Sequence, residues 1–127
     1  MENKKKLGPT IIFIFGGSGD LTKRKLIPAL YNLFLDKFLP EKYLVVGVGR
    51  SAMNDDEYRE KLLGGIKELS RRKEELDHKW AEFSQHVSYQ SHDLEDDQSY
   101  KAIYNWISEK GAEWNTQPNV IFYLSVA

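Results

Sequence analysis

The sequence of 127 residues contains no cysteine, which excludes disulfide bonds, thiolate metal sites and a cysteine nucleophile. It has only four prolines, and no segment rich in proline, glycine or serine divides it, so we expect one domain. No apolar run approaches the roughly 20 residues that a membrane-spanning helix needs. A protein without cysteine suits a reducing compartment, and we expect a cytoplasmic location.

A strong excess of charge of either sign is also missing. Eighteen basic residues against nineteen acidic residues give a net charge of −1. This balance leaves no broad positive surface for nucleic acid or an anionic membrane, so any anionic ligand has to meet a local site. With 41% hydrophobic and 13% aromatic residues, the chain is apolar enough to build one hydrophobic core. The composition therefore predicts a soluble globular domain with no nucleic-acid or membrane partner.

Short apolar runs alternate with longer stretches of helical periodicity. Thr10 to Phe15 is a continuous β-branched and aromatic run, typical of a strand that is buried on both faces. Further strands are expected over residues 43–48, 86–89 and 119–125, and helices over about 27–38, 55–69, 72–84 and from residue 95 onward. Residues 1–9 are expected to form a flexible tail. Residues 20–26 are expected to form a turn, because Pro28 is tolerated only near the start of a helix.

Apolar residues spaced three and four apart predict which side of each helix is buried. The expected inner faces are Leu26, Ile27, Leu30, Leu33, Phe34 and Phe38; Tyr58, Leu62, Leu63, Ile66 and Leu69; Leu76, Trp80 and Phe83; and Tyr100, Ile103, Tyr104 and Ile107. Strands separated by helices predict right-handed crossovers and an α/β, Rossmann-like fold with a doubly wound parallel sheet. We expect this sheet to be truncated after about four strands, because the chain stops where such a sheet normally continues.

Glycines directly follow the first expected strand, in the segment Phe15-Gly16-Gly17-Ser18-Gly19-Asp20-Leu21-Thr22. Glycine suits a sharp strand-to-helix turn, and a phosphate approaches backbone N–H groups only where no Cβ intervenes. The turn therefore predicts a site for the pyrophosphate of a dinucleotide, with Thr22 at the last position of an imperfect fingerprint. A glycine-rich turn without a ligand is the alternative.

A phosphate-binding P-loop, G-x-x-x-x-G-K-[ST], is a competing interpretation of residues 17–24. It fails twice, because Thr22 stands in place of the second glycine and Arg24 offers no hydroxyl for Mg²⁺. A P-loop kinase is therefore the weaker hypothesis.

The residues after the second strand indicate which coenzyme is bound. NAD-specific domains place an acid there to hold the ribose 2′-hydroxyl, but Gly49-Arg50-Ser51 contains none, and the next acid is Asp55. A guanidinium beside a hydroxyl suits a 2′-phosphate, because its planar fork donates two charge-assisted hydrogen bonds. This arrangement predicts NADP. An ordinary solvated arginine is the alternative.

The segment Phe15-Gly16-Gly17-Ser18-Gly19-Asp20-Leu21-Thr22-Lys23-Arg24-Lys25-Leu26-Ile27-Pro28 resembles the N-terminal coenzyme-binding segment of the glucose-6-phosphate 1-dehydrogenase family. The triplet Gly19-Asp20-Leu21, followed by basic residues and Pro28, is more specific than the glycines alone. The resemblance covers essentially residues 10–127 and includes Val46 to Ser51, Asp93-Leu94 and Val120 to Leu124. Thr22 replaces a more usual alanine.

The resemblance implies coenzyme-binding roles at three places. The pyrophosphate cradle and its turn are assigned to Gly16, Gly17, Ser18, Gly19, Asp20 and Leu21. The 2′-phosphate is assigned to Arg50 and Ser51, with Lys25 as a further candidate for a nearby phosphate contact. The adenine side is assigned to Asp93 and Leu94, although Asp93 is equally well explained as the N-cap of the following helix.

The same resemblance implies an enzyme that oxidises glucose 6-phosphate at C1, passes hydride to NADP⁺ and yields 6-phosphogluconolactone in the oxidative pentose phosphate pathway. It also implies a homo-oligomer. Family members are several times longer, and this chain ends before the Glu-Lys-Pro-Phe-Gly motif and the catalytic histidine and aspartate. We therefore expect no catalytic residue here and no activity from this chain alone. A free-standing NADP-sensing module without catalysis is the alternative.

The histidines and tryptophans are expected to have structural roles and not catalytic or ligand-binding ones. His78, His86 and His92 match no usual metal-ligand spacing, so we expect structural or solvated histidines and no metal site. Trp80, Trp106 and Trp114 are expected in the core or in packing between domains. If the chain is cut from a larger partner, apolar surface is expected to be uncovered along the last strand and the helices beside it.

Overall fold

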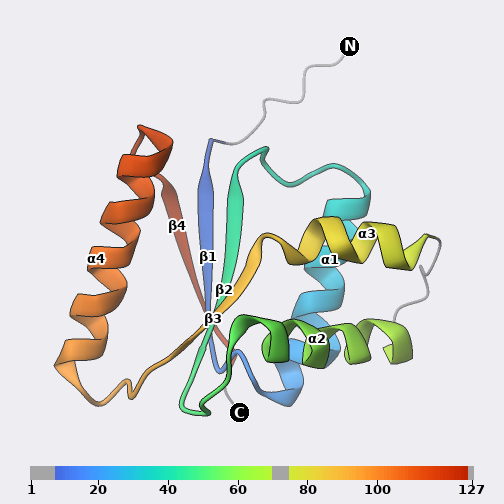
Figure 1. Cartoon of the computed structure of the whole chain (residues 1–127), viewed down its shortest axis with the longest axis horizontal. Helices are drawn as coiled ribbons and strands as arrows, with labels where there is room; N and C mark the ends of the chain where they lie inside the picture. Colours follow the sequence, from blue (N-terminus) through green and yellow to red (C-terminus); the bar gives the residue numbers. More distant parts are fainter. Residues whose placement is uncertain (1–7, 70–74, 126–127) are drawn as a thin grey trace.

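Four parallel strands form one sheet in the order β3-β2-β1-β4 (Figure 1). The computed structural model describes residues 8–69 and 75–125. The strands are β1 (Thr10–Phe15), β2 (Tyr43–Gly49), β3 (Val87–Ser91) and β4 (Asn119–Leu124). Because β1 pairs with both β2 and β4, the strand expected to be buried on both faces occupies the inside of the sheet.

Helices cover both faces of this sheet (Figure 1). The helical segments are η1 (Thr22–Leu26), α1 (Ile27–Leu35), α2 (Asp55–Leu69), α3 (Leu76–Ser84) and α4 (Asp97–Trp114). α1, α2 and α3 lie on one side of the strands, and α4 lies on the other. The predicted α/β, Rossmann-like, doubly wound parallel sheet is confirmed.

Alternate residues of β1 supply the cores on the two faces. Ile14 packs with Ile27, Tyr31, Tyr58 and other residues of the side that carries α1, α2 and α3. The intervening residues pack toward α4, and they are Ile11, Phe13 and Phe15. Of the predicted tryptophans, Trp80 is buried in the first core, while Trp106 and Trp114 pack against the second.

Residues 20–26 are helical, so the predicted turn is wrong. The helix begins at Asp20, and its residues 22–26 form the π-helical segment η1, closed by a hydrogen bond from Ile27 N–H to Thr22 O. Pro28 explains this wider turn, because it has no N–H to donate and its ring crowds the carbonyl four residues earlier. The helix therefore starts directly at the glycine turn.

α1 ends at Leu35, earlier than predicted, and leaves Leu33 and Phe38 exposed instead of buried. Phe38 N–H donates to Leu33 O (2.9 Å) and Lys37 N–H to Phe34 O (3.0 Å), with Lys37 in the left-handed region at φ 62°. These bonds form a Schellman motif. The usual sequence signal for this motif is glycine, and lysine occupies its place here.

The buried face of α4 is rotated relative to the predicted one. Tyr100 and Tyr104, expected to point inward, are 50% and 72% exposed. Ser99 and Ile103 are buried instead, and Trp106 meets Phe13 edge-on with ring centroids 5.7 Å apart. The predicted helix is therefore present as α4, but the prediction of its buried face is wrong for Tyr100 and Tyr104.

Other boundaries differ by a few residues. β3 begins one residue later than predicted and continues to Ser91, and β4 ends at Leu124. Glu75, at φ 53°, directly precedes α3, and the predicted start of that helix at residue 72 lies outside the described residues. Residues 1–7 of the predicted tail also lie outside them, whereas Pro9 O accepts a hydrogen bond from Asn119 N–H (2.9 Å).

The predicted apolar surface along the last strand is confirmed. Four consecutive residues of β4 are 43–69% exposed, namely Ile121, Phe122, Tyr123 and Leu124. Within the described part of the chain, β4 pairs with β1 alone and forms an edge of the sheet. No helix in that same part is both long and apolar enough to cross a membrane.

Candidate functional site

The glycine turn lies where the carboxyl ends of β1 and β4 meet. α4 crosses from β3 over the opposite face to β4, so the direction of winding reverses between β1 and β4. Open α/β sheets bind ligands in the crevice at such a reversal. The fold therefore brings the predicted pyrophosphate turn to the position where a nucleotide is expected.

Hydrogen bonds to β2 fix the first half of the turn. The N–H groups of Gly16 and Gly17 both donate to Val48 O, at 2.9 and 3.1 Å. Gly16 has φ 85°, a conformation that side chains resist, so a glycine is required there. Gly19 N–H then donates back to Gly16 O at 2.9 Å, which closes the turn.

The second half of the turn presents unpaired donors. No described residue accepts a hydrogen bond from the backbone N–H of Ser18, Asp20 or Leu21. These groups lead into the first turn of the helix, where N–H groups have no partner inside the helix and the helix dipole favours an anion. The turn can therefore donate several backbone hydrogen bonds to a phosphate group.

Gly17 and Gly47 allow the turn to lie directly on β2. A Cβ at Gly17 would stand 2.6 Å from Gly47 Cα, which leaves no room for a side chain. Beneath them, the buried Tyr58 hydroxyl donates to Gly17 O at 2.8 Å. Burial raises the pKa of Tyr58, so the phenol stays protonated and keeps this donor. The helical spacing predicts that Tyr58 is buried, but no sequence motif indicates its contact with the turn.

Tyr58→Phe is expected to lower the free energy of unfolding by about 1–3 kcal/mol, because Gly17 O then loses a buried hydrogen-bond donor while the ring is retained. Denaturant unfolding measures this change. The matched control is Tyr104→Phe, whose side chain is 72% exposed and whose replacement should leave stability unchanged. Equal stability of the wild type and Tyr58→Phe would contradict the role given to this hydroxyl.

Lys61 is a second residue that the sequence did not single out. Its Nζ lies on α2 and donates to Ser18 O at 2.9 Å. Lys61 and Ser18 are 43 positions apart in the sequence, and no sequence motif predicts their contact. The contact places a positive charge beside the turn.

Arg50 directly follows β2 and forms ion pairs with two acids of the loop after β3. Its Nη2 lies 3.2 Å from Asp93 Oδ1 and 3.8 Å from Glu95 Oε2. The backbone N–H of Glu95 and the Arg50 guanidinium hold the pKa of Asp93 below its ordinary value, so Asp93 carries its charge at neutral pH. The alternative interpretation of Asp93 as the N-cap of α4 is wrong, because Asp96 has that position and accepts from Gln98 N–H.

A pocket of about 310 Å³ joins these groups to the glycine turn. Four predicted site residues line it, namely Gly16, Arg50, Asp93 and Leu94. His92 also lines it, with its Nε2 2.9 Å from Gln90 Oε1. The structure thus brings the first residue of the glycine turn, Arg50 and the predicted adenine-side residues to one pocket.

The remaining predicted residues lie around this pocket or away from it. Ser51 is exposed, and its carbonyl accepts from the Tyr89 hydroxyl at 2.8 Å. Asp20 pairs with Arg24 at 3.0 Å, and Leu21 is 44% exposed. Lys25 is exposed on η1 and does not line the pocket.

A buried pair of hydroxyl groups connects the turn to the end of β4. Thr22 Oγ1 lies 2.8 Å from Ser125 Oγ and 3.0 Å from Gly16 O. Ser125 N–H also donates to Phe15 O at 2.8 Å. The unusual threonine of the fingerprint therefore holds the turn and the end of β4 together.

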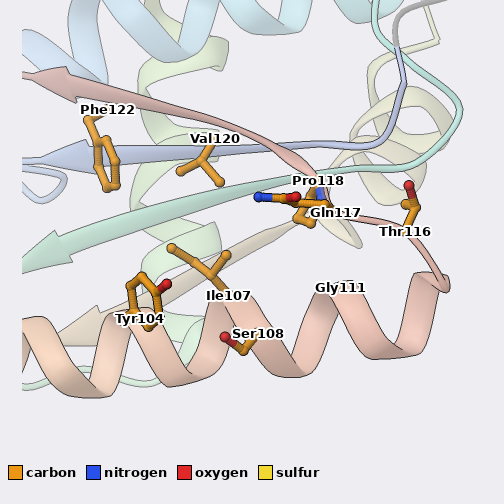
Figure 2. Close-up of a pocket in the computed structure, with 9 residues that line it drawn as sticks. All are labelled: Tyr104, Ile107, Ser108, Gly111, Thr116, Gln117, Pro118, Val120 and Phe122. Carbon is orange, nitrogen blue, oxygen red and sulfur yellow. The ribbon is translucent and has the colours of Figure 1, made fainter.

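A larger hollow of about 620 Å³ lies between α4 and β4 (Figure 2). Ile107 projects into it from α4, opposite Val120 and Phe122 of β4. Its lining contains no acidic or basic side chain among the described residues. No group of three or more metal-ligating side chains is found in residues 8–69 and 75–125.

Comparisons with known proteins agree with this geometry. The family described as "Glucose-6-phosphate dehydrogenase, NAD binding domain" matches residues 13–127. A glucose-6-phosphate 1-dehydrogenase from Leuconostoc mesenteroides is 39% identical over 93% of this chain and 24% of its own length. One from Aggregatibacter actinomycetemcomitans is 40% identical over 90% of this chain and 22% of its own.

Solved structures show the same similarity. A glucose-6-phosphate dehydrogenase in complex with its substrate glucose-6-phosphate superposes with a TM-score of 0.86 at 31% identity, over 99% of this chain and 26% of that one. The enzyme from Mycobacterium avium, at 22% identity and a TM-score of 0.77, shares the fold. The chain spans about a quarter of the length of these relatives. It belongs to the glucose-6-phosphate dehydrogenase family and corresponds to the family's NAD binding domain.

Proposed function

We propose that the chain is the NADP-binding part of a dehydrogenase that oxidises glucose 6-phosphate to 6-phosphogluconolactone. The observation that carries the proposal is one pocket at the carboxyl ends of the strands, lined by both Gly16 of the glycine turn and Arg50. Family membership supplies the reaction class. We also propose that the whole protein is a cytoplasmic homo-oligomer and acts in the oxidative pentose phosphate pathway.

The residues present fit a phosphorylated dinucleotide. The free N–H groups of Ser18, Asp20 and Leu21 suit the pyrophosphate, while Gly16 and Gly19 keep side chains out of its way. Arg50 suits the 2′-phosphate, and Asp93 and Leu94, which line the same pocket, are proposed for the adenine side. Bound NADP⁺ supplies the hydride acceptor of the reaction.

The P-loop interpretation lacks comparable support. The lysine of a P-loop points into the loop toward the phosphates, whereas the side chain of Lys23 lies along Gly65 of α2. Arg24, in the place of the hydroxyl residue, pairs with Asp20 on the helix surface.

The 127-residue chain alone is expected to bind NADP⁺ weakly and to catalyse nothing. Hydride transfer needs a base within hydrogen-bond reach of the sugar hydroxyl and a pocket that holds the reacting atoms about 3–3.5 Å apart. The described residues present the coenzyme side alone. Mixing the chain with glucose 6-phosphate and NADP⁺ and following the absorbance of the reduced coenzyme tests this, with a coenzyme titration in parallel.

Turnover that persists after contaminating enzyme is removed would contradict the proposal that this chain binds the coenzyme but does not catalyse the reaction alone. A chain that binds neither NADP⁺ nor NAD⁺, and is folded by circular dichroism, would overturn the proposed function itself. Binding without turnover agrees with the proposal.

A further inference from the structure

One guanidinium and two carboxylates meet at the rim of the coenzyme pocket. Asp93 and Glu95 both approach Nη2 of Arg50, at 3.2 and 3.8 Å. No described residue accepts a hydrogen bond from Arg50 Nε or Nη1. The guanidinium can therefore bind a phosphate through its other donors while Nη2 still faces the acids.

The two acids are held in different ways. The fold fixes Asp93, because its Oδ1 also accepts from Glu95 N–H (3.0 Å) and its carbonyl accepts from Ser99 Oγ (2.8 Å). The side chain of Glu95 is 88% exposed, and Arg50 is its one polar side-chain partner in the described part of the chain. Glu95 therefore adds negative charge to the pocket without organising it.

The charge at this rim is unfavourable for a phosphate. Arg50 is the one lysine or arginine among the described residues that line the pocket, and it faces two acids. A 2′-phosphate brings about two further negative charges at neutral pH. Two unit charges about 4 Å apart in water change an equilibrium constant roughly fivefold, and salt screens part of this effect. NAD has an uncharged hydroxyl in place of the 2′-phosphate, so the two acids do not repel it at this position.

We propose that Glu95 is a specificity-determining residue, whose carboxylate opposes the 2′-phosphate of NADP and so narrows the preference for NADP over NAD that Arg50 creates. This inference rests on the proposed function. Loss of the Glu95 charge then favours NADP⁺ selectively.

The test compares wild type with Glu95→Gln in the intact protein, by measuring Kd for NADP⁺ and for NAD⁺ at low and at moderate salt. We expect Glu95→Gln to bind NADP⁺ roughly three- to tenfold more tightly, with NAD⁺ unchanged within about twofold. The gain should shrink as salt is raised. Glu95→Lys, which reverses the charge, should give a larger gain of the same kind.

Glu109→Gln is the matched control, because it removes the same charge from an exposed position about three turns into α4. It should leave both Kd values unchanged. An unchanged or weakened NADP⁺ affinity in Glu95→Gln, or an equal gain for NAD⁺, overturns the inference while coenzyme binding by the wild type still supports the proposed function. A wild type that binds neither coenzyme overturns both.

Discussion

Gly19→Val is expected to weaken the binding of NADP⁺ and NAD⁺ alike by about a hundredfold or more. A Cβ at Gly19 would lie 3.1 Å from Gly16 O, the atom that Gly19 N–H itself contacts. We also expect the branched side chain to obstruct the approach of the pyrophosphate to the backbone N–H groups of the turn. Loss of two charge-assisted hydrogen bonds to the pyrophosphate, at about 1.5–3 kcal/mol each, accounts for this effect. Isothermal titration with each coenzyme measures it.

Gly64→Val provides the matched control for this substitution. A Cβ at Gly64 meets no atom within 4 Å, so the same chemical change is made in open space on α2. Circular dichroism and a melting curve establish that both variants fold. Unchanged coenzyme binding in folded Gly19→Val would place the ligand elsewhere on the molecule.

Arg50→Ala is expected to weaken NADP⁺ binding roughly ten- to a hundredfold and to leave NAD⁺ binding nearly unchanged. The guanidinium can donate charge-assisted hydrogen bonds, at about 1.5–3 kcal/mol each, to the 2′-phosphate, which NAD⁺ lacks. Titration of both coenzymes against both proteins measures the selective loss. Because Arg50 is 70% exposed, its replacement should not impair folding.

Arg24→Ala separates a selective effect from a general loss of positive charge. Arg24 is also exposed and also paired with an acid, Asp20, but it lies on the helix that follows the turn. Any effect of Arg24→Ala should fall on NADP⁺ and NAD⁺ equally. Equal losses for the two coenzymes in Arg50→Ala would remove Arg50 from the 2′-phosphate site.

Local sequence predicts the parts of the site that depend on backbone requirements. Gly16 has φ 85°, which side chains resist, and Gly17 lies against β2 with no room for a side chain, so the glycines mark the turn in the sequence itself. Arg50 is recognisable because its place at the end of β2 follows from the strand. The Rossmann-like fold is also predictable from local sequence, because apolar residues recur with different periods in strands and in helices.

Contacts between distant residues are not visible in the sequence. The Tyr58 hydroxyl on Gly17 O, Lys61 on Ser18 O and Glu95 beside Arg50 depend on how the helices and loops pack. The helix boundaries failed for a different reason. Lys37 takes a position that glycine usually marks, and a π-helix before Pro28 replaces the expected turn.

The position of β1 between β2 and β4 determines when its two backbone edges are paired during folding. During synthesis β1, β2 and β3 are available first, but β1 gains its second neighbour only when β4, the fourth of the described strands, has left the ribosome. Pairings between distant segments form slowly. Until then the uncharged, apolar β1 has one open backbone edge, which is the type of segment that chaperones protect and that aggregates when unprotected. The docking of β4 is therefore the step of folding that protects the centre of the sheet.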